Sequence, residues 1–289
     1  MLSLFTRVGI GYQVCLNLAS RGCRVIIADK DDSEKSKNRI IALTQNPNII
    51  SKYLDLSSFK SVRDFADDFK GTEGRLDILV NNAGISVSSL KPTEDGLDLL
   101  MQVNYLGPFL LTHLLIDLLK KSAPSRIVFT SSCLAFLGDL KSNDVYFTTS
   151  NSCSSFTTLN SYSNSKLATL IASDIFAKKL KYTGVTSNSL HPGLVLTNIF
   201  KALKKIENTG SISEMFFNIC HFFFGKSIWE GAQTTTHLAV CEDLDGVTGE
   251  YFWDCRRFVK PRRAYDEEMC QKIWELSENH AKLLPHEKI

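Results

Sequence analysis

The chain lacks disulfide-like cysteine spacing, metal-ligand histidine spacing, a strong net charge and a long apolar run. Its eight cysteines are scattered singly without a C-x-x-C pair, which favours reduced thiols facing the cytosol over a disulfide framework. The six histidines show no H-x-x-x-H spacing, so no metal site is expected. A formal net charge of +2 gives no general case for nucleic acid binding.

No apolar stretch reaches the roughly eighteen residues that are needed to span a bilayer. The amino end, Met1–Phe5, is too short for a signal peptide. The 289 residues are 44% hydrophobic, which suits one globular domain with a large core. We therefore expect a protein of the cytoplasm, or of the cytosolic face of a membrane, without a transmembrane segment.

Apolar runs and amphipathic segments alternate along most of the chain. Residues 24–28 form a continuous apolar run, as in strands that are buried on both faces, and residues 57–69 carry apolar side chains at helical spacing. This alternation predicts a doubly wound, Rossmann-type α/β fold in a single domain. Strands are expected at 24–28, 49–54, 76–80, 126–130 and 185–190, and helices at 9–21, 32–44, 57–69, 95–120, 162–182 and 265–282.

Tyr162 and Lys166 are the most informative residues for function. On a helix they lie four positions apart, so the phenol and the ammonium project from one face. A nearby ammonium favours the phenolate and makes the phenol usable as a general acid/base near neutral pH. Ser132 ends an apolar run and can donate a hydrogen bond to a carbonyl or alkoxide oxygen. These three groups suit carbonyl reduction or alcohol oxidation.

Other polar motifs follow predicted strands in the same way, namely residues 81–84 (Asn-Asn-Ala-Gly) and residues 191–197 (His-Pro-Gly-Leu-Val-Leu-Thr). In this order, the set resembles the short-chain dehydrogenase/reductase family over nearly the whole chain. Residues 103–112 and 231–235 look like the retinol dehydrogenase group of that family. The resemblance implies an NAD(P)-dependent oxidoreductase that acts on an alcohol/carbonyl pair.

The resemblance also assigns roles to individual residues. Tyr162 is the implied acid/base, Lys166 its pKa partner and a ligand of the nicotinamide ribose, and Ser132 the group that holds the substrate oxygen. Asn104 is expected to keep a water in a proton relay behind Lys166. His191 is expected to shape a turn. The resemblance further places these residues around the cofactor: Asp55, Leu56, Asn81, Ala83, Gly84, Pro192, Gly193 and Thr197.

The cofactor's phosphates are expected at Gly9-Ile10-Gly11, which open the first helix. Asp29 follows the second strand, where a carboxylate that binds ribose hydroxyls belongs. That carboxylate would repel the 2′-phosphate of NADP. Lys30, in contrast, stands where the retinol dehydrogenase group has an arginine that favours NADP. The sequence leans only slightly to NAD.

The glycine-rich turn departs from the family pattern. Its usual T-G-x-x-x-G-x-G form would need Thr at Leu4 and Gly at Phe5, and the first strand is cut to about residues 1–4. Phe5 does not readily take a positive φ, and its ring would occupy space near the phosphates. Either the amino end is incomplete or alternatively started, or cofactor binding is being lost. The second explanation gives an alternative function, a non-catalytic binding or scaffolding module.

The expected domain organisation is a dinucleotide-binding domain at 1–255, with a substrate-capping segment at about 198–230 and a helical tail at 256–289. The aromatic run 215–224 lies in the capping segment and suits a retinoid- or lipid-like substrate. A peripheral membrane contact and a homo-oligomer stay open. For the basic cluster, a solvated loop and a membrane-surface contact are the two interpretations; the cluster consists of Arg256, Arg257, Lys260, Arg262 and Arg263.

Overall fold

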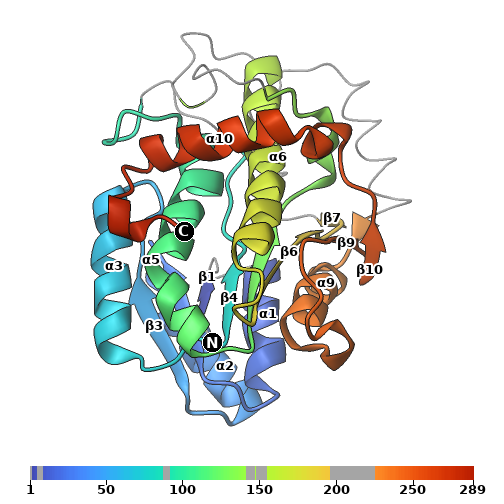
Figure 1. Ribbon diagram of the computed structural model, residues 1–289. Helices are drawn as coiled ribbons and strands as arrows, with labels where there is room; N and C mark the ends of the chain where they lie inside the picture. Colours follow the sequence, from blue (N-terminus) through green and yellow to red (C-terminus); the bar gives the residue numbers. More distant parts are fainter. Residues whose placement is uncertain (1, 5–8, 87–91, 141–146, 148–154, 196–224) are drawn as a thin grey trace.

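The computed structural model describes the chain except residues 1, 5–8, 87–91, 141–146, 148–154 and 196–224 (Figure 1). Strands and helices alternate, as the sequence predicts. Strands are β1 (Leu2–Leu4), β2 (Val25–Asp29), β3 (Ile49–Tyr53), β4 (Ile78–Asn81), β5 (Ser125–Thr130), β6 (Val185–His191), β7 (Leu194–Val195), β8 (Gly225–Lys226), β9 (Tyr251–Trp253) and β10 (Arg256–Phe258). Helices are α1 (Ile10–Ala19), α2 (Glu34–Thr44), α3 (Phe59–Thr72), α4 (Leu99–Met101), α5 (Gly107–Lys121), α6 (Ser155–Lys179), α9 (Ile228–Val240) and α10 (Glu267–His280).

Within the described residues, the centre of the molecule is an eight-stranded sheet in the order β10-β9-β6-β5-β4-β1-β2-β3. Neighbouring strands are parallel except β9 and β10. The first four residues of β2 are buried, as expected for a strand that helices cover on both faces. The prediction of a single doubly wound α/β domain is confirmed.

The short β1 lies in the middle of this sheet. Ser3 is in register with Ile27 of β2 on one side and Val80 of β4 on the other. The chain continues from β1 to β2 and β3, and then crosses to β4 on the opposite side. Ligands of open parallel sheets bind beyond the carboxyl ends of the strands at such a switch point. Phe5, which raised the question of a damaged turn, lies outside the described residues.

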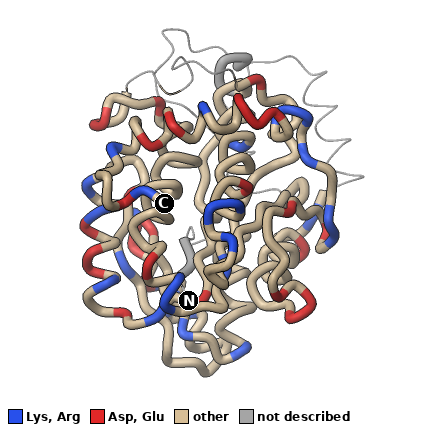
Figure 2. Tube along the Cα trace, in the orientation of Figure 1, with Lys and Arg blue, Asp and Glu red and all other residues tan. Residues whose placement is uncertain are grey.

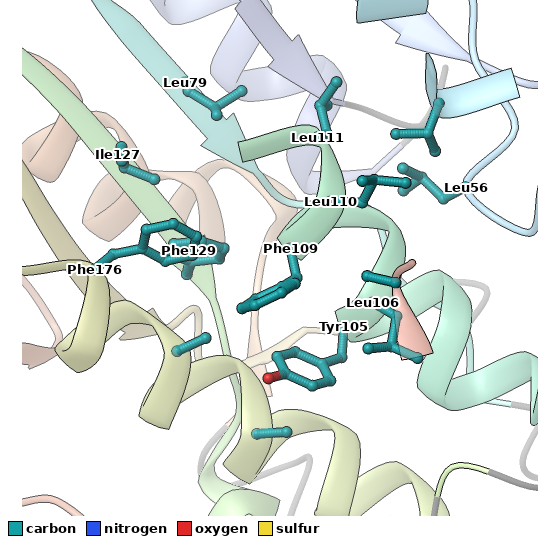
Figure 3. Close-up of a cluster of buried hydrophobic side chains, with 14 of the residues drawn as sticks. Leu56, Leu79, Tyr105, Leu106, Phe109, Leu110, Leu111, Ile127, Phe129 and Phe176 are labelled. Carbon is teal, nitrogen blue, oxygen red and sulfur yellow. The ribbon is translucent and has the colours of Figure 1, made fainter. Parts of the chain in front are cut away.

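Two layers of helices cover the sheet. Helices α3, α5 and α6 pack on one face, and α1, α2 and α9 on the other. On the first face, the ring of Phe176 in α6 lies 5.7 Å from Phe109 in α5 and 5.8 Å from Phe129 in β5 (Figure 3). Such aromatic pairs bury large areas and fix the separation of helix and sheet. The site-bearing helix α6 is thereby packed directly onto β5.

Helix α10 lies across α5 and α6 (Figure 1). The Trp274 ring is 4.9 Å from both Phe109 and Phe176, edge-on to each. The hydroxyls of Tyr105 and Ser277 hydrogen-bond at 2.6 Å. Asp266 caps the helix by accepting a hydrogen bond from the backbone of Met269. The carboxyl-terminal helix therefore braces the two helices that flank the site.

Residues 99–121 form one continuous helical segment. A π-helical stretch, Gln102–Leu106, joins α4 to α5, and Asn104 lies within it. Among the described residues, this segment alone is long and apolar enough, by length and composition, to cross a membrane, and 83% of its apolar window is buried inside the protein. π-Helical turns often occur at functional sites because they redirect side chains.

Two segments differ from their expected secondary structure. The helix expected at 162–182 is α6 and begins earlier, at Ser155, because extending an existing helix needs no new nucleus. Part of the basic cluster is a strand instead of a loop: Arg256–Phe258 form β10, whose three residues are exposed to solvent. Lys260 pairs with Asp174 of α6 at 2.7 Å, so the segment is tied to the domain.

Candidate active site

The polar residues of the candidate site gather at the carboxyl ends of β4, β5 and β6. Strand β5 ends at Thr130 and is followed by Ser131 and Ser132, while β6 ends at His191. The backbone N–H of Ser131 still donates to Leu190 of β6 at 2.8 Å, so the two strand ends are held in register. This edge is where the sequence predicts the chemistry to occur.

Tyr162 and Lys166 lie one turn apart on α6, and both are buried. The Nζ atom of Lys166 is 5.7 Å from the centre of the Tyr162 ring and donates a hydrogen bond to the Thr130 carbonyl at 3.0 Å. Burial lowers the pKa of Lys166 to about 8, because the interior disfavours its charged form. The ammonium is therefore anchored to the end of β5, facing the region beside the phenol.

Ser132 meets Tyr162 from the opposite element. It is the N-cap of a short 3-10 turn, η2 (Cys133–Leu137), and its hydroxyl oxygen accepts a hydrogen bond from the Leu134 backbone at 3.2 Å. Burial raises the pKa of Tyr162 to about 12, and a hydrogen bond from Ser132 opposes that rise. We expected the Lys166 ammonium to bring the phenol toward neutral pH. In this structure burial outweighs that effect, because the ammonium is directed at a carbonyl group instead of the phenol oxygen.

Ser131 was not singled out for function from the sequence. Its hydroxyl donates to the backbone carbonyl of Lys166 at 2.7 Å, and so ties the end of β5 to the turn of α6 that carries the lysine. Thr130 has a comparable role through its carbonyl group. The only available signal was the position of both residues next to Ser132 at the end of an apolar strand.

Asn104 is buried in the π-helical stretch and bonds to the loop after β4. Its side-chain oxygen accepts from the Ile85 N–H at 2.7 Å, and its amide donates to the Ile85 carbonyl at 2.9 Å and to Ser165 at 3.1 Å. Gly84 lies between Asn104 and Lys166: a Cβ atom there would be 3.2 Å from Lys166 Nζ and 3.3 Å from Asn104 Oδ1. Asn104 and Lys166 thus line the same small space.

Asp29 and Asp55 end neighbouring strands on the other side of the switch point. Asp29 accepts a hydrogen bond from the Asp31 backbone at 3.0 Å, and the neighbouring Lys30 is exposed. Asp55 accepts from both the N–H and the hydroxyl of Ser57, which is local turn chemistry before α3. The side chain of Leu56 is buried in the core. Both carboxylates thus accept a hydrogen bond from the backbone N–H two positions further along the chain.

The remaining predicted residues divide by position. Asn81 is buried at the end of β4, where its amide donates to Thr112 at 3.1 Å and its oxygen has no hydrogen-bond partner among the described residues. Ala83 packs partly on the core. Pro192 and Gly193 form the turn between β6 and β7, with Gly193 at φ 93°. Thr197 lies outside the described residues.

The family model for short chain dehydrogenases matches residues 6–208. The chain belongs to this family. As a short-chain dehydrogenase/reductase it is an NAD(P)-dependent oxidoreductase, and the retinol dehydrogenase-like resemblance is confirmed by its relatives. No observation supports the non-catalytic alternative.

Relatives of this short-chain dehydrogenase/reductase include retinol dehydrogenase 12 of Mus musculus, 39% identical over 271 residues, covering 93% of this chain and 82% of that protein. Retinol dehydrogenase 14 of Mus musculus is 38% identical over 282 residues with the same coverage. Among solved structures, an uncharacterised protein from Mycobacterium paratuberculosis superposes with TM-score 0.71 at 24% identity, covering 97% of this chain and 92% of that one. An NADPH-bound short chain oxidoreductase from Pseudomonas aeruginosa PAO1 gives TM-score 0.65 at 18% identity, covering 87% and 93%.

The start of α1 fits the phosphates of a dinucleotide. Gly9 precedes the helix with φ 79° and ψ −148°, a conformation that side chains disfavour, and no acidic residue lies in the first turn. A helix leaves its first N–H groups without intrahelical acceptors, and these attract phosphate. Gly231 of α9 packs close by, since a Cβ atom there would lie 2.4 Å from Val195 and 3.3 Å from Ile10. Among the described residues, the N-terminus of α1 is thus suited to bind an anion.

Proposed function

We propose that the enzyme interconverts a hydrophobic, retinoid- or lipid-like alcohol and its carbonyl compound, with Tyr162, Ser132 and Lys166 as the catalytic group. The observation that carries this proposal is the convergence of the three side chains from two elements: hydrogen bonding from Ser132 lowers the pKa of the Tyr162 phenol against the effect of burial, and Lys166 lies one helical turn away with its Nζ atom 5.7 Å from the centre of the Tyr162 ring. Such a group moves a proton to or from one oxygen atom, which is what alcohol/carbonyl interconversion requires.

With its pKa near 12, the Tyr162 phenol keeps its proton at neutral pH and is ready to donate it to a carbonyl oxygen. The Ser132 hydroxyl oxygen already accepts a hydrogen bond from the Leu134 backbone, which leaves the hydroxyl proton available to donate to the phenol or to the substrate oxygen. Bound NAD(P) supplies or accepts the hydride. Proton transfer by a positioned side chain contributes roughly 10²–10⁴-fold to such a rate.

We propose that Lys166 and Asn104 assist proton transfer by the Tyr162 phenol. A lysine pKa lowered to about 8 means that the ammonium releases a proton easily into the space it shares with Asn104. The Asn104 amide fixes the loop at Ile85 through two hydrogen bonds and so shapes that space. This arrangement suits a proton path that leads away from the phenol.

The proposed substrate class rests on the relatives' names and on the surface beside Ser132. The two curated relatives described above are retinol dehydrogenases. The turn that follows Ser132 exposes Phe136 and Leu137, and the ring of Phe136 lies 6.4 Å from both Tyr251 and Phe258. Apolar and aromatic walls suit a long hydrophobic substrate. The capping segment expected at about 198–230 lies mostly outside the described residues and remains part of this proposal.

For the cofactor we propose a preference for NAD. Asp29 ends β2 at the position of a ribose ligand, and its carboxylate would repel the 2′-phosphate of NADP by roughly 4 kcal/mol per unit charge at 4 Å in a surface-like dielectric. Lys30 is exposed next to it and opposes that preference. An Asp29→Ala variant that gains affinity for NADPH relative to NADH would support the assignment.

We also propose a peripheral contact with an anionic membrane through the segment 256–263. Phe258 and Val259 are exposed between Arg256, Arg257 and Arg262, and Figure 2 shows basic residues following one another along this edge. Exposed apolar side chains within a basic rim suit a surface of acidic lipid. Retention on phosphatidylserine vesicles, lost in Val259→Ser with Arg256→Ser and absent for phosphatidylcholine alone, would support the contact. Equal retention of the double variant would contradict it.

The test of the main proposal uses retinal with NADH and NADPH. We expect saturable binding of a reduced cofactor by tryptophan fluorescence, and turnover that Tyr162→Phe abolishes while cofactor binding is nearly unchanged. Tyr182→Phe is the matched control, because that phenol is 91% exposed. Parental turnover in Tyr162→Phe would contradict the acid/base assignment, and no binding of either cofactor would contradict the whole proposal.

A further inference from the structure

The turn that begins at Ser132 has three N–H groups that need acceptors. A helical turn leaves its first donors without partners inside the turn. Here the Leu134 N–H donates to the Ser132 hydroxyl oxygen at 3.2 Å, and the Ala135 N–H donates to the Ser132 carbonyl at 3.0 Å. The Cys133 N–H donates to Nδ1 of His191 at 3.2 Å. His191 is thus the only partner of the Ser132 turn, among the described residues, that comes from β6.

The position of His191 follows from where the β5–β6 ladder ends. Its last backbone bond runs from the Ser131 N–H to the Leu190 carbonyl. If β6 continued, the next acceptor would lie two residues beyond Leu190. The chain instead turns at Pro192 and Gly193, and the φ of Gly193 is 93°. The imidazole of His191 takes the place of that missing carbonyl. Without it, the N–H next to Ser132 would lose its bond to β6.

The imidazole is fixed in the orientation that this bond needs. His191 is buried, and its ring lies edge-on to Trp253, with centroids 4.5 Å apart and planes at 78°. Burial lowers the pKa of His191 to about 4, with the nearby Lys226 acting in the same direction and Asp254 opposing it. The ring is therefore neutral at physiological pH. Because Nδ1 accepts a hydrogen bond, the ring proton is on Nε2.

We propose that His191 is a positioning residue: its Nδ1 holds the Cys133 N–H, and so fixes the Ser132 hydroxyl against Tyr162. The hydrogen bond from the Cys133 N–H to Nδ1 distinguishes His191 from a histidine that only fills space in the core. His191 itself touches no reacting atom.

The first test measures activity, and in this respect the inference rests on the proposed function. His191→Leu removes the acceptor, whereas His191→Asn keeps an oxygen near the position of Nδ1. We expect kcat to fall roughly 10–100-fold in His191→Leu, since small displacements of catalytic groups have effects of this size. The Asn variant should recover most of the loss, and His191→Leu should bind NADH and NADPH like the parent. His286→Leu, at an exposed histidine, is the control.

A double-mutant cycle separates positioning from a general structural effect. If His191 acts through Ser132, adding His191→Leu to Ser132→Ala should lower kcat less than about 3-fold further, because the group it positions is already gone. A full additional 10–100-fold loss would overturn the proposal. Equal activity of the Leu variant and the parent would also overturn it.

The second test needs no substrate and keeps the two proposals distinguishable. In the parent protein, long-range ¹H–¹⁵N NMR of labelled histidine should show an unprotonated Nδ1 for His191 at pH 7, and the Cys133 amide should be protected from exchange. The His191→Leu variant should lose that protection. A protonated Nδ1, or an unprotected Cys133 amide in the parent, would overturn the inference even in an active enzyme. An inactive parent with the expected spectrum would contradict the proposed function alone.

Discussion

Asn104 pairs with the backbone of Ile85 much as a neighbouring strand would. Its side-chain oxygen accepts from the Ile85 N–H at 2.7 Å, while its amide donates to the Ile85 carbonyl at 2.9 Å. The pairing fixes the loop after β4 immediately next to Gly84 and Lys166. A side chain on the π-helical stretch thereby lines the space in which the Lys166 ammonium lies.

Removing the Asn104 amide should weaken both the fold and the site. Asn104→Ala leaves two backbone groups of Ile85 without partners, and we expect the free energy of unfolding to fall by about 1–3 kcal/mol. Turnover should fall as well. Urea denaturation and steady-state kinetics measure the two effects. Asn279→Ala, at an exposed helical asparagine, should change stability by less than about 0.5 kcal/mol. An Asn104→Ala variant with the unfolding free energy and the turnover of the parent would show that the pairing with Ile85 is not needed.

Gly84→Ala should affect activity more than stability. The new Cβ would lie 3.2 Å from Lys166 Nζ and 3.3 Å from Asn104 Oδ1, so the ends of both side chains must shift by a few tenths of an ångström. We expect turnover to fall several-fold with less than about 1 kcal/mol lost in unfolding free energy. Gly71→Ala in α3 is the control, because nothing lies within 4 Å of its new methyl group. A loss of stability without a loss of turnover would contradict the expectation.

Lys166→Met should give a more stable but inactive protein at pH 7. Burial lowers the folded-state pKa of Lys166 to about 8, so the charged form destabilises the fold. We expect a gain of about 2 kcal/mol, since the shift corresponds to somewhat more and the lost bond to Thr130 offsets part of it. Thermal unfolding measures the gain, with the exposed Lys121→Met as control.

The same variant makes a signed prediction for pH. Between pH 8 and 10.5 the unfolded chain holds the lysine proton and the folded protein does not, so the parent gains stability as pH rises through this window. The advantage of Lys166→Met should therefore shrink from pH 7 to pH 10. If the gain in stability of Lys166→Met stays constant with pH, or if the variant is less stable than the parent at pH 7, then the buried ammonium does not destabilise the fold.

Lys260 and Asp174 form a largely buried ion pair, so removing one side chain leaves the other without its charged partner. Lys260 Nζ donates at 2.7 Å to both Asp174 and the Gly249 carbonyl, and burial raises the pKa of Asp174 to about 6. Lys260→Met leaves a buried carboxylate and should lower stability by about 3 kcal/mol at pH 8. Adding Asp174→Leu should restore much of it, as equilibrium unfolding can measure.

The effect of pH on Lys260→Met has a definite sign. The pKa of Asp174 is already raised above its ordinary value, and losing the lysine, which lowers it, raises it further. The folded variant then takes up a proton more readily than the unfolded chain as pH falls through 6 and below, so its stability deficit should be smaller at pH 5 than at pH 8. A deficit that grows at pH 5 would contradict this account.

The sheet and the residues at its carboxyl edge were predictable because they depend on local patterns. The apolar run of β2 and the spacing of Tyr162 and Lys166 are written in consecutive residues. The short central β1 was also predictable, since the run of residues before Phe5 is short. Parallel topology then brings the strand ends to one edge without further information.

The contacts within the site were not predictable, because they join residues distant in sequence. Nothing near His191 indicates that its ring bonds the Cys133 backbone, 58 positions away. Likewise, the direction of the Lys166 ammonium toward Thr130, and with it the high pKa of Tyr162, depends on how deeply α6 packs. Burial is a property of the assembled fold, and no local pattern encodes its depth.

The tyrosine and the lysine sit on a helix that has almost no solvent-facing side over their turns: residues 162–173 are buried throughout. This part of α6 cannot rotate or slide without disrupting the core that packs around it. The turns of α6 that carry the Tyr162 phenol and the Lys166 ammonium are therefore held in one position by the core on every side.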